Sequence, residues 1–330
     1  MLILTKAILS MMIGFIITVL VGGITIPILK RINVKQKVSS YLEKKHKEKD
    51  GTPTMGGIIF IIPTIITTII LLLTGKLEFT HNLAIVMFVF IAYALLGFID
   101  DYLIIRRGNN IGLTEFQKLA GQIIIALVFF YIFMKSGADP SLDMYTFGIK
   151  INMGWLYGLF ILFMLVASSN AVNITDGLDG LAGGLSLMAF LALGLISWNS
   201  NAITGTQDIA IFCFILVGTL LGFLLFNTHP ARVFMGDTGS LSLGATLASV
   251  ALITKHEITF IVIMGVFIFE TLVCIIQTIS MVCFRKKVFL MTPFHHHLEK
   301  LGWHERDIVK FFWVIGLILS MGAIIFGVWI

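Results

Sequence analysis

The chain has 330 residues, of which 58% are hydrophobic and only 12% are charged. This composition excludes an ordinary soluble domain and predicts an integral membrane protein. The formal net charge of +5 favours contact with anionic lipid headgroups over nucleic-acid binding, because no basic tract is interleaved with aromatic residues. Cys213, Cys274 and Cys283 lie within apolar runs, at spacings that match neither a disulfide framework nor a zinc site.

A helix that crosses a bilayer needs roughly 20 apolar residues. Stretches of this kind recur along the whole chain, and they predict an all-α integral membrane protein with about ten transmembrane helices in one domain, residues 1–330. The first stretch is interpreted as a retained helix, since no small-residue cleavage site precedes a polar mature domain. The runs lie near residues 4–29, 55–74, 82–99, 119–134, 151–172, 181–198, 208–226, 238–254, 258–284 and 308–329.

The orientation follows from the loops between these runs, because short loops rich in Lys and Arg stay in the cytoplasm. Most basic residues fall in the odd-numbered loops, which places both termini outside the cytoplasm. The same orientation puts Asp100, Asp101, Asp176, Asp179 and Asp237 on the cytoplasmic face, where we expect the active site. The basic residues on the other side are Lys6, Lys76, Lys135, Lys150 and Lys255.

Loop one ends in Lys49, followed by Gly-Thr-Pro-Thr-Met-Gly-Gly over residues 51–57. It is not a P-loop, because no Gly-Lys-Ser or Gly-Lys-Thr follows. Lys49 could contact a phosphate, or it could serve only as a positive-inside lysine. Lys118, at the start of the fourth run, allows the same two interpretations.

Asp100 and Asp101 end the third apolar run. A helix separates adjacent side chains by about 100°, so the two carboxylates are expected to have different roles. They repel each other unless a cation or a shared proton lies between them. The alternative is a solvated helix terminus, where exposed charges contribute little.

Loop five contains Asn173, Asp176 and Asp179, with Gly177 and Gly180 between and after the aspartates. If this stretch is helical, the spacing of three puts the polar side chains on one face. The glycines would let a ligand approach the backbone closely. The alternative is a glycine turn with caps.

Loop seven runs from Asn227 to Ser240, and an apolar run follows Asp237. Asp237 could be the N-cap of that helix. A helix N-terminus also directs backbone N–H groups toward an anion, so capping and anion binding predict the same geometry. Phe234 could stack on a nucleotide base.

Loop nine contains His295, His296 and His297, which would point in different directions from a helix. A zinc site needs ligands that converge at about 2 Å, so hydrogen bonding or proton transfer is favoured for these histidines. Within the ninth run, Glu270 and Gln277 share one helical face, where polar groups indicate either helix packing or a function.

These motifs together resemble those of the phospho-N-acetylmuramoyl-pentapeptide transferases, within the polyprenyl-phosphate N-acetylhexosamine-1-phosphate transferase superfamily. The resemblance covers essentially the whole chain. It implies transfer of phospho-MurNAc-pentapeptide from its UDP carrier to undecaprenyl phosphate, giving lipid I and UMP, with Mg²⁺ as cofactor. It further implies a bacterial plasma-membrane enzyme of peptidoglycan synthesis and suggests a homodimer.

The resemblance also implies roles for single residues. Asp237 is the expected Mg²⁺ ligand, with Asp100 or Asp101 as a further ligand, and Asp100 is the expected base or activator of the lipid phosphate. Asp101 supports the site, and His295 and Lys118 contribute to catalysis. The uridine pocket is expected from Gly177, Leu178, Asp179, Asn227 and Phe234, and further substrate contacts from Lys49, Thr54, Asn173, Asp176, Gln277 and His296.

Two other functions fit part of the sequence. A sister transferase that uses UDP-GlcNAc would share the metal and the lipid chemistry. A cation-coupled transporter would also carry intramembrane acids such as Glu270. The transporter is disfavoured because its charged groups should lie near the bilayer midplane, whereas these aspartates gather on one side.

Overall fold

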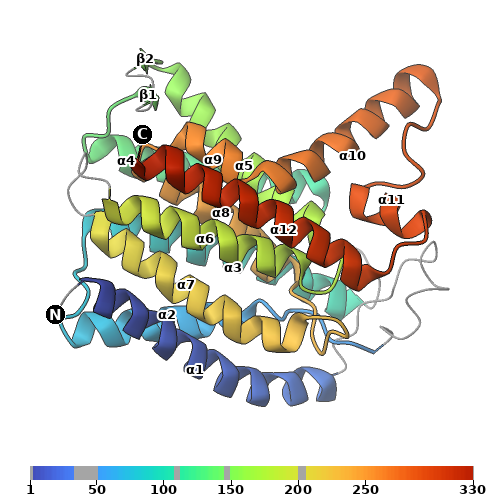
Figure 1. The fold of residues 1–330 in the computed structure, drawn as a ribbon, viewed down its shortest axis with the longest axis horizontal. Coiled ribbons are helices and arrows are strands. Elements are labelled where there is room, and N and C mark those ends of the chain that lie inside the picture. The colour runs from blue at the N-terminus through green and yellow to red at the C-terminus, as the bar shows by residue number, and fades with distance from the viewer. Residues whose placement is uncertain (1–2, 33–50, 108–111, 145–148, 200–205, 330) are drawn as a thin grey trace.

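The computed structural model describes residues 3–32, 51–107, 112–144, 149–199 and 206–329. Long helices make up most of this part of the chain and lie side by side as a bundle (Figure 1). They are α1 (Ile3–Arg31), α2 (Ile58–Leu73), α3 (His81–Arg107), α4 (Glu115–Lys135), α5 (Leu156–Thr175), α6 (Leu181–Asn199), α7 (Thr206–Asn227), α8 (Gly236–Ile253), α10 (Gly265–Phe284) and α12 (Glu305–Ile324).

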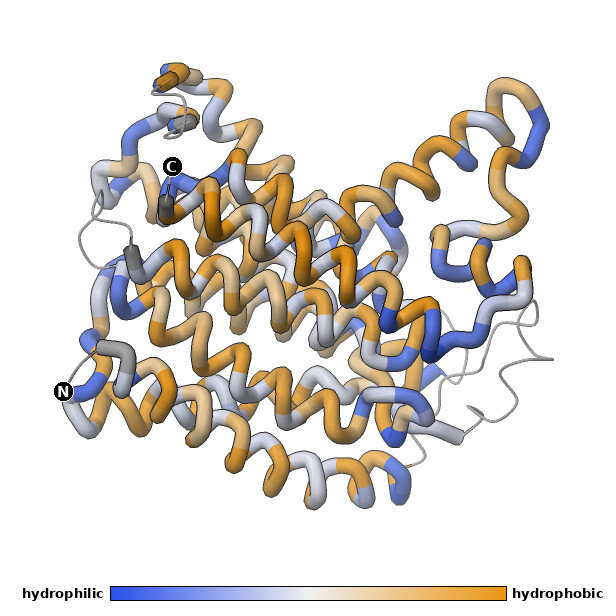
Figure 2. The backbone as a smooth tube through the Cα atoms, in the orientation of Figure 1, coloured by the Kyte–Doolittle hydropathy of each residue, from blue (hydrophilic) through white to orange (hydrophobic). Residues whose placement is uncertain are grey.

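Eight helices in the described part of the chain are long and apolar enough to cross a membrane. The prediction of a helical, multi-pass membrane protein is therefore confirmed. α2 is a shorter apolar helix of 16 residues, and α8 is not among the eight. Figure 2 shows hydrophobic residues along the helices and hydrophilic residues concentrated toward their ends.

α8 lies inside the bundle, and residues 238–253 are all buried. It packs against α3 on one side and α5 on the other. Small residues permit this close packing, since a Cβ on Gly244 would overlap the backbone of Ser168 in α5. α8 is thereby held between two helices that carry other predicted site residues, namely Asp100 and Asp101 in α3 and Asn173 in α5.

The prediction of one helix over residues 258–284 was wrong. The chain forms α9 (Glu257–Ile263), leaves helical geometry at Met264, where ψ is 6°, and continues as α10. Gly265 at this junction has low helix propensity. A short helix, α11 (Phe294–Lys300), then precedes α12, which ends in a π-helical turn, η3 (Ile325–Trp329).

The fold also contains a small antiparallel sheet, which the all-α prediction missed. Strand β1 (Ser141–Met144) pairs with β2 (Ile149–Asn152), so α5 begins at Leu156 and not near residue 151 as predicted. The Lys255 ammonium donates to the carbonyls of Asp139 and Ser141 at 2.5 and 2.8 Å and thereby fastens this hairpin to the end of α8.

The two chain ends and α11 lie on opposite sides of the bundle. In Figure 1 the N and C marks are at the left, whereas α11 lies at the right. The C-terminal ends of α1, α3, α5 and α7 therefore gather at the end of the bundle where α11 lies. This arrangement brings the aspartate motifs to one end of the bundle.

His256, between α8 and α9, provides a test of how the opposite end of the bundle responds to pH. It is 7% exposed, and burial lowers its pKa from 6.5 to about 4. The folded state therefore binds fewer protons than the unfolded state in this range, and stability is lost as the pH falls from 6.5 toward 4. We expect the Tm in detergent to fall across this window, and to fall less in His256→Gln. An equal pH dependence in both proteins would contradict this assignment.

Candidate active site

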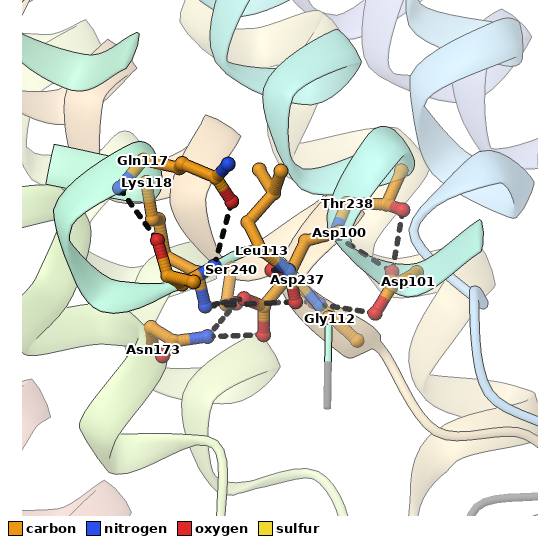
Figure 3. Close-up of polar contacts among 12 residues, drawn as sticks. Asp100, Asp101, Gly112, Leu113, Gln117, Lys118, Asn173, Asp237, Thr238 and Ser240 are labelled. Carbon is orange, nitrogen blue, oxygen red and sulfur yellow. Dashed lines mark hydrogen bonds and ion pairs between the residues drawn. The ribbon is translucent and has the colours of Figure 1, made fainter. Parts of the chain in front are cut away.

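Asp237 lies at the centre of the cluster in Figure 3, in the first turn of α8. Its Oδ1 accepts a hydrogen bond from Asn173 Nδ2 at 2.7 Å, and its Oδ2 accepts one from Lys118 Nζ at 2.6 Å. Asn173 also donates to Ser240 Oγ at 2.9 Å. Side chains from α4, α5 and α8 thus hold one carboxylate, although they are far apart in sequence.

The prediction that Asp100 and Asp101 end their helix was wrong, since α3 continues to Arg107. Asp100 lies beside Asp237 and is 3% exposed. Its Oδ1 accepts a hydrogen bond from the backbone N–H of Leu113 at 2.8 Å, and its Oδ2 is 3.5 Å from Lys118 Nζ. The Lys118 ammonium therefore faces two carboxylates from different helices. The Lys118 side chain is therefore engaged in the cluster, and it is only 15% exposed.

Asp101 has hydrogen-bond partners different from those of Asp100. Its Oδ2 accepts from Thr238 N–H at 3.0 Å and from Thr238 Oγ1 at 2.6 Å, while its Oδ1 accepts from Asp237 N–H at 3.2 Å. Asp101 thus caps the N-terminus of α8 from the neighbouring helix. The alternative in which Asp237 is the N-cap was wrong, since Met235 occupies that position without a side-chain bond.

Close packing around this cap requires glycine at two positions. Gly236 has a φ of +73°, and a Cβ there would lie 2.6 Å from Asp101 Oδ2. A Cβ on Gly97, in α3, would overlap the backbone carbonyl of Asp237. α3 and the start of α8 can approach this closely because neither glycine carries a side chain.

Loop one and loop seven, which the sequence presented as separate motifs, are joined by backbone hydrogen bonds. Phe234 N–H donates to the Pro53 carbonyl, Gly56 N–H to the Phe234 carbonyl and Gly57 N–H to the Met235 carbonyl, each at 2.8 Å. Thr54, within this pairing, is 3% exposed. Lys49 lies outside the described residues.

Asn227 and Phe234 occupy different places in loop seven. Asn227 is buried and donates to the Val233 carbonyl at 3.0 Å, which closes the loop on itself. Its Oδ1 is buried and has no hydrogen-bond partner among the described residues, so it remains available as an acceptor. Phe234 is half-buried.

Loop five does not form the single polar helical face that the spacing predicted. α5 ends at Thr175, and Asp176 is its C-cap. Asn173 points to Asp237, whereas Asp179 points to His229 and lies with it and Glu305 in a second group. Asn173 and Asp179 therefore belong to two different groups of side chains, because the chain turns at Gly177 and Gly180 before α6 begins.

His295 lies in α11 and is completely buried. A Cβ on Gly177 would overlap its Nε2, so loop nine packs directly on loop five. Glu270 of α10 accepts from the backbone N–H groups of Phe294 and His295 at 2.5 and 3.2 Å, and thus anchors the start of α11. The sequence drew attention to Glu270 as a carboxylate in an apolar run, and this anchoring is its role in the fold.

His296 and Gln277, two predicted substrate contacts, are engaged within loop nine. His296 Nδ1 lies 2.7 Å from Glu299 Oε2. The Gln277 Oε1 accepts from the backbone N–H groups of Val288 and Phe289, both at 3.0 Å. These contacts attach both side chains to loop nine. They differ in this from Lys118 and Asn173, which bond directly to Asp237.

The donor atoms at the cluster suit a divalent cation. One carboxylate oxygen from each of Asp100, Asp101 and Asp237 lies within 4.8 Å of the others, and the single ammonium of Lys118 leaves the group with excess negative charge. Asp101 accepts three hydrogen bonds from the start of α8, more than Asp237 or Asp100 accepts, so Asp100 and Asp237 are the better ligands. Oxygen ligands of this kind suit Mg²⁺.

The fold and this site define a multi-pass membrane protein that holds a cation-compatible carboxylate cluster at one end of its helices. Residues 83–255 match the sequence model of glycosyl transferase family 4, and residues 49–61 match phospho-N-acetylmuramoyl-pentapeptide-transferase signature 1.

Relatives of known name match nearly the full chain. A phospho-N-acetylmuramoyl-pentapeptide-transferase of Geobacillus sp. (strain WCH70) is 46% identical over 324 residues, which cover 98% of each chain. The protein of the same name from Bacillus subtilis (strain 168) is 44% identical and covers 97% of this chain and 98% of its own length. The chain therefore belongs to the phospho-N-acetylmuramoyl-pentapeptide-transferase family, and the resemblance inferred from its motifs is confirmed.

Proposed function

We propose that this chain transfers phospho-MurNAc-pentapeptide from its UDP carrier to undecaprenyl phosphate, releasing UMP and forming lipid I in the bacterial plasma membrane. The observation that carries the proposal is 46% identity over 98% of both chains to a relative of that name. An acidic cluster at the end of an apolar bundle supports it, because one substrate is soluble and the other keeps its phosphate at the membrane surface. We take residues 1–330 as a single transferase domain.

In this reaction an oxygen of the lipid phosphate attacks the sugar-linked phosphorus of the nucleotide, and the bond from that phosphorus to UMP breaks. Such transfers depend mainly on positioning and on stabilising charge. Asp100 would accept a proton from the lipid phosphate and so keep the nucleophile ionised. Lys118 holds Asp100 and Asp237 in a fixed relation through its contacts at 3.5 and 2.6 Å.

Mg²⁺ is the proposed cofactor, and Asp237 with Asp100 would hold it. When bound, the ion neutralises phosphate charge, including the charge that develops on the leaving UMP. Asn173 orients Asp237 through the hydrogen bond to its Oδ1. Asp101 positions the same residue by fixing the first turn of α8.

The nucleotide pocket would form where loops one, five, seven and nine meet. Support comes from the pairing of loop one with loop seven and from the contact between Gly177 and His295. We propose His295 as a catalytic group and a homodimer as the assembly. The proposed uridine contacts are Gly177, Leu178, Asp179, Asn227 and Phe234, and the further substrate contacts are Lys49, Thr54, Asn173, Asp176, Gln277 and His296.

Asp100→Asn tests the proposed base. We expect kcat to fall by roughly 10²-fold, with loss of the acidic limb of the pH–rate profile, because the amide cannot accept the proton. Initial rates of UMP release across pH would measure this. A variant whose profile keeps the wild-type shape would exclude Asp100 as the base.

The choice of nucleotide sugar separates the proposal from its nearest rival. Purified protein in detergent is given undecaprenyl phosphate with either UDP-MurNAc-pentapeptide or UDP-GlcNAc, and UMP is measured. We expect release with the muramoyl-pentapeptide substrate only. Release with UDP-GlcNAc alone would assign the chain to the sister activity.

A further inference from the structure

Gln122 is a buried polar residue of α4, one helical turn after Lys118, and it is 1% exposed. α4 packs against α3 and α5, and the other residues that it buries, Ala126, Phe129 and Phe133, are apolar. A buried amide in an apolar bundle is costly unless its hydrogen bonds are satisfied. Gln122 is therefore the buried polar contact through which α4 meets its neighbours next to the Asp237 cluster.

The side-chain amide of Gln122 joins α4 to α5. Its Oε1 accepts a hydrogen bond from Asn170 Nδ2 at 3.0 Å, and its Nε2 donates to Ser169 Oγ at 3.3 Å. The Val166 carbonyl fixes both partners, since it accepts from Asn170 Nδ2 at 2.8 Å and from Ser169 Oγ at 2.9 Å. The amide thus meets groups whose positions are set by α5 itself.

The backbone of the same residue joins α4 to α3. The Tyr93 hydroxyl donates to the Gln122 carbonyl at 3.2 Å. Tyr93 is completely buried and lies two turns before Asp100 in α3. Gln122 therefore ties together the three helices that supply Asp100, Lys118 and Asn173 to the cluster.

The sequence spacing places these bonds one turn away from the cluster. Lys118 and Gln122 are four residues apart in α4, so their side chains lie on one face of that helix. A rotation or shift of α4 that broke the Gln122 bonds would move Lys118 with it. The Lys118 ammonium would then leave Asp237 Oδ2, which it now meets at 2.6 Å, and Asp100 Oδ2, which lies 3.5 Å away.

Two explanations of these bonds predict different effects. Hydrogen bonds between membrane helices often serve packing alone, and their loss would then lower stability without a specific effect on the reaction. A positioning role predicts an effect that passes through one side chain of the cluster. Lys118 is that side chain, because Asn173 has a separate bond to Ser240 Oγ at 2.9 Å.

We propose that Gln122 is a positioning residue, which holds Lys118 on Asp237 and Asp100 and thereby sets the rate of the transfer. The inference rests on the proposed function, because it concerns the same cluster. It adds a residue that touches neither substrate nor the carboxylates.

Gln122→Met tests the proposal, since it keeps the length of the side chain and removes both side-chain hydrogen bonds. We expect kcat for UMP release to fall about tenfold, while KM for both substrates stays within about twofold of wild type. Thr219→Val is the matched control, because it removes a buried contact between α7 and α2, where the Oγ1 atoms of Thr219 and Thr64 are 3.0 Å apart. It should lower the Tm in detergent and leave kcat unchanged.

A double-variant cycle separates positioning from packing. In a Lys118→Met background the ammonium is already absent, so Gln122→Met should lower kcat by less than about twofold further. A tenfold loss in both backgrounds would overturn the proposal, and so would a wild-type kcat in Gln122→Met. If Gln122→Met does not fold, Asn170→Ala, which removes the donor to Gln122 Oε1, takes its place in the same cycle.

The wild-type protein in these assays distinguishes the two proposals. Wild-type protein that releases UMP, together with a cycle that shows no coupling to Lys118, would overturn the positioning role alone. Wild-type protein that releases no UMP from UDP-MurNAc-pentapeptide would overturn the proposed function, and the positioning role with it.

Discussion

Asp237→Asn is expected to lower the rate of UMP release by roughly 10³-fold, a loss typical of removing a group that stabilises transition-state charge. The substitution keeps the shape of the side chain but removes the negative charge between Lys118 and Asn173, whose nitrogens lie 2.6 and 2.7 Å from its oxygens. Initial rates with saturating Mg²⁺ and both substrates measure the effect. The Tm in detergent should fall less than in Asp101→Asn, because the backbone cap from Asp101 is retained and the Asp237 side chain is 19% exposed, so water can satisfy the donor that loses its partner.

Asp307→Asn is the matched control for this experiment. It removes an acidic charge from α12. The Asp307 side chain is 59% exposed and pairs with Lys310, not with a residue of the cluster. We expect wild-type activity from it. Near-normal UMP release by Asp237→Asn would contradict the role assigned to that carboxylate.

Asp101→Asn is expected to reduce both stability and activity, which distinguishes it from Asp237→Asn. The buried Asp101 oxygens accept from three donors, at 2.6, 3.0 and 3.2 Å. An amide NH₂ in place of one oxygen would face a donor and leave it unsatisfied, at a cost of about 3 kcal/mol. Displacement of the first turn of α8 should also slow catalysis by about 10²-fold through misplacement of Asp237.

Thr238→Val provides the graded comparison for Asp101→Asn. It removes the shortest of the three bonds and leaves the two backbone donors. Thermal unfolding in detergent should place its Tm between those of the wild type and of Asp101→Asn. A Tm for Asp101→Asn equal to that of the wild type would show that the carboxylate does not stabilise the start of α8.

The apolar runs were predictable because twenty-residue hydrophobic stretches have few other stable states in a membrane protein. The exceptions have local causes. The run 258–284 breaks at Met264 and Gly265, and the run predicted over 151–172 took in the last two residues of the strand Ile149–Asn152. In both cases the apolar character of the segment did not reveal where the backbone leaves helical geometry.

The carboxylates of the cluster could be singled out from the sequence, but their geometry could not. Asp100 and Asp237 stood out as carboxylates at the ends of apolar runs, and the structure joins both to Lys118. The sequence could not show that Lys118 is engaged there, because a positive-inside lysine has the same pattern. Likewise, the spacing of Asn173 and Asp179 suggested that they share one helical face. In the structure α5 ends at Thr175, and the turn that follows directs the two side chains to different groups.

The pairing of loop one with loop seven had no sequence signal, because it uses backbone groups of residues 53–57 and 234–235. The group formed by Asp179, His229 and Glu305 escaped notice for a related reason. Its members lie in three loops or helix starts, and no short sequence motif links them.

The dependence of UMP release on Mg²⁺ is the measurement that tests the proposed transfer most directly. Purified wild-type protein is supplied with UDP-MurNAc-pentapeptide and undecaprenyl phosphate, and Mg²⁺ is titrated after chelation of all divalent ions. We predict that release requires the lipid phosphate, is absent without the ion and rises to saturation as Mg²⁺ is added. Undiminished release in the presence of excess chelator would contradict a transfer carried out at the Asp100 and Asp237 cluster.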